Sequence, residues 1–277
     1  MFDFAPCCLS FSTGGWHKAQ PIAFADYRNT IFKTQKECLD VGFLANILEN
    51  HDEPRGNSRY LPEHAQNEQG IKMLGTVSVL LRGLPFLYQG QEIGMRNCPM
   101  DSIEDYDDIS TKNEYANALA DGCTEAEALR ACYRFSRDNA RTPMQWDASA
   151  NAGFTTGTPW LKVNPNYRDL NVAAQETQKE SVLNYYKRLI ALRKSDGYRE
   201  IFTYGDFAPL FETEENILAY RRNLDGKDVI VAANFGAECK CLCSGLFSGR
   251  KVLLSNEPVI LETNTLELRP SQVVVLA

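Results

Sequence analysis

The sequence lacks the marks of several protein classes. None of its 277 residues lies in an apolar run that approaches the roughly 18 residues of a membrane-spanning helix. The first residues, Met1-Phe2-Asp3-Phe4, have neither the basic nor the long apolar segment of a secretory signal, so we expect a cytoplasmic protein with no membrane partner. Acidic residues outnumber basic ones by 36 to 29. This balance argues against a nucleic-acid partner, which would require a basic patch.

The nine cysteines do not form the pattern of a disulfide framework, because they are odd in number and irregularly spaced. Cys239, Cys241 and Cys243 alternate with other residues, so on a strand their thiols would share one face. A structural zinc site usually has four ligands, and no further Cys or His lies near enough in sequence to complete one. We therefore expect no metal, no cofactor and buried thiols on a strand.

The chain changes character near residue 200. Before it, helical patterns alternate with short apolar runs, as in α/β proteins. The run 42–48 is nearly all apolar and is typical of a buried parallel strand, and 85–88 predicts a second strand. Between them, the pattern over 67–81 predicts a helix. A capping box at Thr124 predicts the start of another helix.

After residue 205, short apolar runs separated by turn residues indicate an antiparallel β domain. The pattern of the whole chain is therefore α/β plus all-β. We expect two domains, over residues 1–200 and 205–277. No internal repeat or low-complexity tract is visible.

Polar residues follow both strands predicted in the first part. The segment Glu49-Asn50-His51-Asp52-Glu53-Pro54-Arg55 comes after the first strand, and Tyr88-Gln89-Gly90-Gln91-Glu92 comes after the second. If both strands belong to one parallel barrel, the two segments meet at its C-terminal mouth, where the chemistry of such barrels takes place. Structural roles are the alternative. A lone His–Asp pair is more often a hydrogen-bonded structural pair, and Arg55 and Arg59 could equally be solvated surface charges.

Three longer blocks carry a resemblance to a known family. ILENHDEPRGNSRYLP resembles the seventh-strand motif of the α-amylase superfamily, glycoside hydrolase family 13, and GLPFLYQGQEIGM resembles its eighth strand. Residues 136–167 are similar to a block typical of the oligo-1,6-glucosidase and α-glucosidase branch. The resemblance implies the C-terminal portion of a TIM (β/α)8 barrel, about strands 6–8. A small antiparallel β-sandwich domain would follow it.

The resemblance also implies roles for three residues. His51 and Asp52 would bind hydroxyls of the glucosyl unit being transferred, and Asp52 would stabilise the transition state without attacking the sugar. Arg137 would reach the same sugar, although it could instead be a structural partner of Asp138 or Asp147. A fixed carboxylate suits this chemistry, because the transition state of glycoside hydrolysis resembles an oxocarbenium ion.

Two tryptophans lie in the same block. The rings of Trp146 and Trp160 could form platforms on which a sugar stacks. In PMQW and TPW turns a buried anchor is the commoner role, and we expect that role for both.

The family's other two catalytic groups have no counterpart in the sequence. A retaining glycosidase needs a nucleophile and an acid/base, which this family places after its fourth and fifth strands. Residues 1–4 resemble the sixth strand, so we expect both groups to be absent from this chain. Glu49, Glu53 and Glu92 are available carboxylates, but nothing in the family pattern makes them an acid or a nucleophile.

The expected function is therefore that of an α-glucosidase-type enzyme that hydrolyses terminal α-1,6 or α-1,4 bonds of short gluco-oligosaccharides with retention. We expect the isolated chain to be inactive, and to associate with itself or with a separate N-terminal half. Two alternatives remain open. One is a non-catalytic chain that binds sugar or a partner and completes a split barrel. The other is part of a trehalose-6-phosphate hydrolase or of an isomerase.

Overall fold

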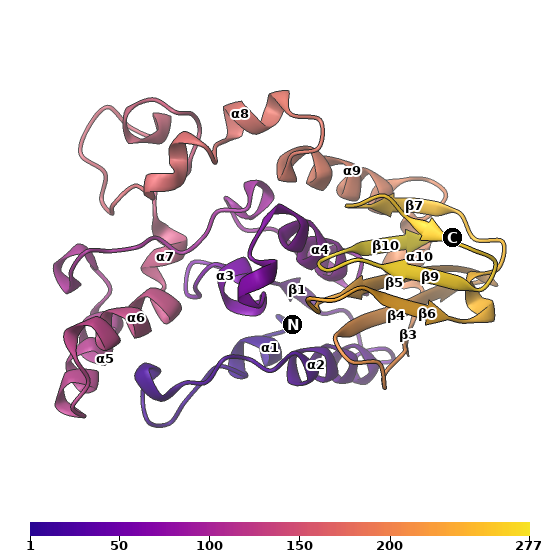
Figure 1. Ribbon diagram of the computed structural model, residues 1–277, viewed down its shortest axis with the longest axis horizontal. Coiled ribbons are helices and arrows are strands. Elements are labelled where there is room, and N and C mark those ends of the chain that lie inside the picture. Colours follow the sequence, from indigo (N-terminus) through magenta and orange to yellow (C-terminus); the bar gives the residue numbers. More distant parts are fainter.

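The computed structural model describes residues 1–277 and combines helices with three β-sheets (Figure 1). The helices are α1 (Ala5–Cys8), α2 (Phe24–Glu37), α3 (Gly56–Tyr60), α4 (Glu68–Val79), α5 (Ile109–Ala120), α6 (Glu125–Phe135), α7 (Asp138–Arg141), α8 (Val172–Thr177), α9 (Val182–Lys194) and α10 (Arg199–Tyr204). The strands are β1 (Ala45–Ile47), β2 (Leu84–Phe86), β3 (Asp206–Leu210), β4 (Ile217–Leu224), β5 (Lys227–Asn234), β6 (Lys240–Cys243), β7 (Val252–Ser255), β8 (Ile260–Leu261), β9 (Thr265–Leu268) and β10 (Val273–Leu276). No helix is both long and apolar enough to span a bilayer.

The first part of the chain contains a short parallel sheet. β1 pairs in parallel with β2, and Phe2 forms a parallel bridge to Ala45 of β1. The two predicted strands are thus present and parallel, although each is only 3 residues long. The arrangement as strands 6–8 of a barrel stays a prediction.

Five of the ten α-helices begin at a residue whose side chain caps the first turn. The side chain of Asn67 accepts hydrogen bonds from the backbone N–H groups of Gln69 and Gly70 and starts α4. The predicted capping box is confirmed, because Thr124 Oγ1 accepts from Glu127 N while Glu127 Oε2 accepts from Thr124 N. These contacts satisfy donors that have no partner within the helix.

The chain after residue 205 forms two antiparallel sheets. One has five strands in the order β3-β4-β5-β10-β7, and the other has three in the order β6-β9-β8. A cluster of 10 buried residues joins them, with Ile230 and Val274 from the larger sheet and Leu242 and Leu266 from the smaller one. The predicted antiparallel strands are therefore present and enclose an apolar core.

The other face of the five-stranded sheet packs on the helices. One cluster of 30 buried residues includes Tyr220 and Val231 of the sheet together with Leu74 of α4 and Leu189 of α9. In Figure 1, α4 and α9 lie beside the sheet. Burial of this sheet face therefore depends on helices from the first part of the chain. The division into domains at residues 200–205 stays a prediction, since a single core extends across it.

A buried arginine ties the sheet to the ends of two helices. Arg222 of β4 is fully buried. It donates to the carbonyls of Leu80 at 3.0 Å, Phe202 at 3.0 Å and Gly205 at 2.8 Å. Leu80 is the C-cap of α4, and Phe202 and Gly205 lie at the end of α10. The guanidinium thus satisfies carbonyls that the helices leave without a donor.

We predict that Arg222→Met lowers the free energy of unfolding by about 3 kcal/mol, because several buried carbonyls lose their donor. Arg221→Met is the matched control. Arg221 is the neighbouring residue, and its side chain makes no hydrogen bond that would be lost. We expect the control to cost about 1 kcal/mol or less. Urea unfolding followed by tryptophan fluorescence checks both values, and equal losses in the two variants would contradict this role of Arg222.

Candidate active site

A buried ion pair closes the segment that follows β1. Arg55 Nη1 lies 3.2 Å from Glu49 Oε1, and both side chains are almost completely buried. Glu49 Oε2 also accepts the N–H of Gly56 at 2.5 Å. Because Glu49 and Gly56 lie at the two ends of residues 50–55, these contacts hold that segment in a closed loop.

Arg55 also binds the backbone of two other segments. It donates to the carbonyl of Gln89, after β2, at 2.7 Å. It donates further to the carbonyls of Asn139 at 3.3 Å and Ala140 at 3.4 Å, both in α7. One side chain therefore fixes the loops after both parallel strands and the helix that carries further site residues.

The interpretation of Arg55 and Arg59 as solvated surface charges is wrong. Both side chains are buried and have polar partners. Arg59 pairs with Glu53 and donates to the carbonyl of Cys7 at 2.6 Å. Glu49 and Glu53 are accordingly occupied by ion pairs with these arginines. Through these ion pairs, Glu49 and Glu53 stabilise the folded structure.

Asp52 lies where the loop after β1 meets α7. Its Oδ1 accepts from Arg137 Nη1 at 3.2 Å and from Arg141 Nη2 at 3.0 Å. Its Oδ2 lies 3.2 Å from His51 Nε2. The side chains of His51 and Asp52 are 71% and 52% exposed, so the group faces solvent. The structure thus brings the three predicted residues together.

Arg141 is a member of this group that the sequence analysis missed. Besides binding Asp52, it donates through Nε to the carbonyl of His51 at 2.8 Å. Its position offers a signal, because it follows Arg137 by four residues and so shares a face with it on a helical turn. Asp138 supports the same turn, since its Oδ2 accepts the N–H groups of Asp107 and Asp108 at 2.8 and 2.9 Å.

A buried carboxylate orients Arg137. Asp108 Oδ1 accepts from Arg137 Nε at 2.6 Å, and Asp108 Oδ2 accepts from the N–H and hydroxyl of Thr111. Burial alone would raise the pKa of Asp108, but the hydrogen bonds from Thr111 and Arg137 outweigh it and lower that pKa. The hydrogen bond to Asp108 raises the pKa of Arg137. The alternative in which Arg137 pairs with Asp138 or Asp147 is wrong, because its carboxylate partners are Asp108 and Asp52.

Neither tryptophan is a buried anchor, which corrects the expectation. Trp146 and Trp160 are 50% and 65% exposed. Gln145 is the fully buried residue of the first turn, where its amide donates to a backbone carbonyl, and Leu161 is the buried residue of the second. Trp160 Nε1 donates to Asp107 Oδ2 at 3.1 Å, which places its ring beside the segment that orients Arg137.

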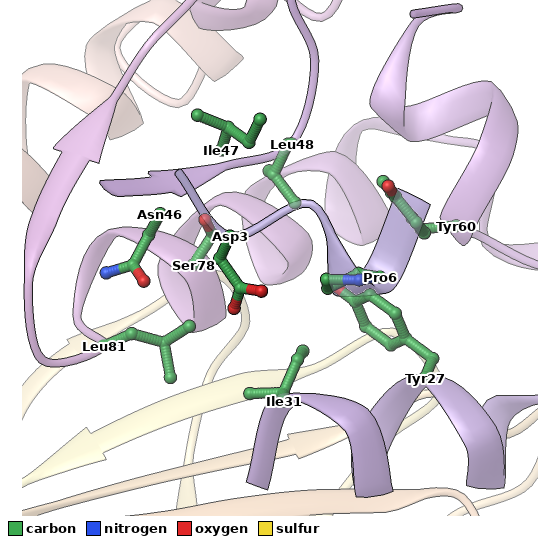
Figure 2. Close-up of a pocket in the computed structure, with 10 residues that line it drawn as sticks. All are labelled: Asp3, Pro6, Tyr27, Ile31, Asn46, Ile47, Leu48, Tyr60, Ser78 and Leu81. Atoms are coloured by element: carbon green, nitrogen blue, oxygen red, sulfur yellow. The ribbon is translucent and has the colours of Figure 1, made fainter. Parts of the chain in front are cut away.

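A small cavity on the helical side of β1 is distinct from this group. Figure 2 shows its lining, with Tyr27 and Ile31 contributed by α2 and Asn46 by β1. Asp3 also lines it, and burial raises the pKa of Asp3. The cavity volume is about 20 Å³, enough for a single water molecule and far too small for a sugar.

The geometry defines an α/β protein with a polar, solvent-facing group at the C-terminal ends of parallel strands. A carboxylate, an imidazole and two guanidinium groups suit a ligand rich in hydroxyls. Residues 1–205 match the profile of the alpha amylase, catalytic domain family. The chain belongs to this family, which confirms the resemblance seen in the sequence.

Two curated relatives of the chain are oligo-1,6-glucosidases. That of Parageobacillus thermoglucosidasius is 39% identical over 276 residues, which are 98% of this chain and 49% of that enzyme. That of Bacillus cereus is 39% identical over 86% of this chain and 42% of its own length. The chain thus spans about half the length of the curated relatives it matches.

Solved structures show the same fold in enzymes of differing name. The trehalose-6-phosphate hydrolase of Bacillus licheniformis is 32% identical, with a TM-score of 0.90 over 99% of this chain and 50% of that one. The trehalulose synthase of Pseudomonas mesoacidophila is 36% identical, with a TM-score of 0.89 and the same coverage. The fold alone therefore does not separate an enzyme named as a hydrolase from one named as a synthase.

The lowered pKa of Asp108 predicts a dependence of stability on pH. The ionised carboxylate stabilises the folded state above the unfolded pKa of about 3.9, and this contribution is lost as the pH falls through the lower folded value. Asp108→Asn removes it. We therefore expect the wild type to exceed the variant in free energy of unfolding most clearly above about pH 5, with the difference shrinking below about pH 4. Urea titrations across this range test it, with the exposed Asp196→Asn as control, and a pH-independent difference would contradict it.

Proposed function

We propose that the chain carries the transition-state-stabilising half of an α-glucosidase-type active site. The observation that carries this proposal is Asp52, a solvent-facing carboxylate fixed by Arg137, Arg141 and His51. In glycoside hydrolysis positive charge develops on the sugar, and a carboxylate already in place stabilises that charge without reorganisation. The reaction is retaining hydrolysis of terminal α-1,6 or α-1,4 bonds in short gluco-oligosaccharides.

His51 and Arg137 are the groups that would bind hydroxyls of the same glucosyl unit. The Nε2 of His51 and the guanidinium of Arg137 already lie on opposite oxygens of the Asp52 carboxylate. Both are partly exposed, so a hydroxyl can reach them. Hydrogen bonds of this kind, which strengthen as charge develops, lower the barrier more than they tighten ground-state binding.

Double displacement needs a nucleophile and an acid/base that this group does not supply. We propose that both come from polypeptide outside these 277 residues, whether in the same chain or in another. The coverage of about half of each relative supports this. Three curated relatives that are 36–39% identical to the chain are oligo-1,6-glucosidases, which favours the glucosidase over the trehalose-6-phosphate hydrolase as the whole enzyme.

An apolar sheet face offers a place for that polypeptide. Phe2, Leu84 and Phe86 are 45–58% exposed, and the rings of Phe2 and Phe86 meet edge to face at 5.0 Å. β2 pairs with β1 alone, so its other edge is open. Open edges and contiguous apolar side chains favour association. Further parallel strands would cover this face, and copies of the chain are the competing occupant.

A chimera tests the proposed function. The N-terminal half of the Parageobacillus enzyme is joined to residues 1–277, and the chain alone is assayed beside it with p-nitrophenyl α-glucoside and isomaltose. We expect no turnover by the chain alone and turnover by the chimera, because only the chimera contains all three carboxylates. Turnover by the chain alone would contradict the proposal, and so would an inactive chimera that melts cooperatively.

We predict that Asp52→Asn in the active chimera lowers kcat by more than about tenfold, or about 1.4 kcal/mol, with a smaller effect on KM. The reason is that the carboxylate acts mainly on the charge of the transition state. Asp196→Asn is the control, because Asp196 is an exposed carboxylate far from Asp52 in the sequence. Steady-state kinetics measure both, and an unchanged kcat for Asp52→Asn would remove the assigned role.

We predict that Trp160→Ala raises KM for isomaltose severalfold, while Trp146→Ala leaves it nearly unchanged. Both rings are exposed, but only Trp160 is held by a hydrogen bond beside Asp108 and Arg137. A fixed ring can stack on a sugar at little entropic cost. The same kinetic assay provides the comparison, and equal effects of the two substitutions would show that Trp160 has no special contact with the substrate.

A further inference from the structure

The outer surface of the three-stranded sheet carries exposed thiols. Cys241 and Cys243 of β6 and the preceding Cys239 are all exposed and free. Leu242, between the two strand cysteines, is buried in the core between the sheets. The expectation of buried thiols is therefore wrong. The alternation of a strand places Leu242 inward and its two neighbours outward.

Cys241 and Cys243 are close enough to act on one ligand. On a strand, Cα atoms two residues apart on the same face are separated by about 6.6 Å, within the range that two linked cysteines span. Desolvation raises the pKa of Cys241, and the neighbouring thiol of Cys243 raises it further. The shared face and this spacing are what place the two thiols within reach of one ligand.

The position of β6 leaves this pair accessible. β6 is an edge strand, since β9 is its only neighbour in the sheet. The residues opposite the cysteines on β9 are Glu267 and Thr265, and both cysteines are exposed beside them. The site lies on the three-stranded sheet and does not depend on the proposed glucosidase function.

We propose that Cys241 and Cys243 form a dithiol site that binds one soft, thiophilic centre through both sulfur atoms. No group of three or more His, Cys, Asp or Glu side chains is placed to hold a metal ion, so a four-ligand zinc site does not fit. Two sulfur ligands suit a centre satisfied by two bonds from the protein, such as a trivalent arsenical or a monovalent copper ion. Thiolates select soft centres of this kind.

Binding of an arylarsine oxide follows a simple balance. Two sulfur–arsenic bonds form, and the oxygen of the arsenical leaves as water with the two thiol protons. Arsenic and sulfur keep their oxidation states, so no oxidant or reductant is required. With a copper ion, the two thiols instead lose their protons to solvent and bind the metal as thiolates.

The test uses the intact 277-residue chain and phenylarsine oxide, with the adduct measured by intact-protein mass spectrometry. We expect one adduct per chain that survives 2-mercaptoethanol and is removed by 2,3-dimercaptopropanol, because only a dithiol competes with a chelating pair. Cys241→Ser and Cys243→Ser should each abolish the adduct. Cys239→Ser is the matched control, since it removes an exposed thiol just before β6, and it should retain the adduct.

Cys7 and Cys8 are adjacent in sequence, but the burial of Cys7 excludes a chelate between them. Cys7 is 2% exposed and its sulfur lies 3.2 Å from the hydroxyl of Tyr60. Cys8→Ser should therefore also retain the adduct. Thermal unfolding of each variant confirms that exposed Cys→Ser changes leave the fold intact.

Two results would overturn the site. An adduct that persists in Cys241→Ser or Cys243→Ser would place it on other thiols, and an adduct lost in Cys239→Ser would show a different pair. A second arm adds monovalent copper before the arsenical. We expect copper to block the adduct, and failure to do so would contradict the assignment of the site to soft centres as a class.

Discussion

The buried Arg55 is the constraint on which the site depends. A guanidinium without water must find partners for its N–H groups, and Arg55 finds them in Glu49 and in carbonyls after β2 and in α7. Burial of such a pair costs desolvation energy, which only a nearly complete set of hydrogen bonds offsets. The loops after the two parallel strands and α7 are consequently held in one arrangement. That arrangement brings Arg137 and Arg141 to Asp52.

The local elements could be predicted from the sequence because their signals are local. The caps at Asn67 and Thr124 and the apolar runs of β1 and β2 involve neighbouring residues. His51, Asp52 and Arg137 were accessible only through the resemblance to a family. Asp108 and Arg141 were missed, since their contacts with Arg137 and Asp52 span 29 and 89 residues.

Burial was the least predictable property. Alternation predicted that Cys241 and Cys243 share a face, but it does not tell which face of a strand meets the core. Leu242 settles that question in the structure, because it packs between the two sheets. The predicted burial of Trp146 and Trp160 was wrong for a related reason, because Gln145 and Leu161 are the residues buried there. The extent of the core could likewise not be predicted from the sequence. It depends on α4 and α9 covering a sheet whose strands lie more than 100 residues after α4.

Amide hydrogen exchange of an Arg55→Lys variant tests most directly whether this one side chain holds the site together. Lysine keeps the charge beside Glu49 but cannot reach the carbonyls of both Gln89 and α7. We predict faster exchange in α7 and in the loop after β2, with unchanged protection in β4 and β5. Unchanged exchange in α7, or an equal loss of protection in the β-sheet, would contradict the central role of Arg55.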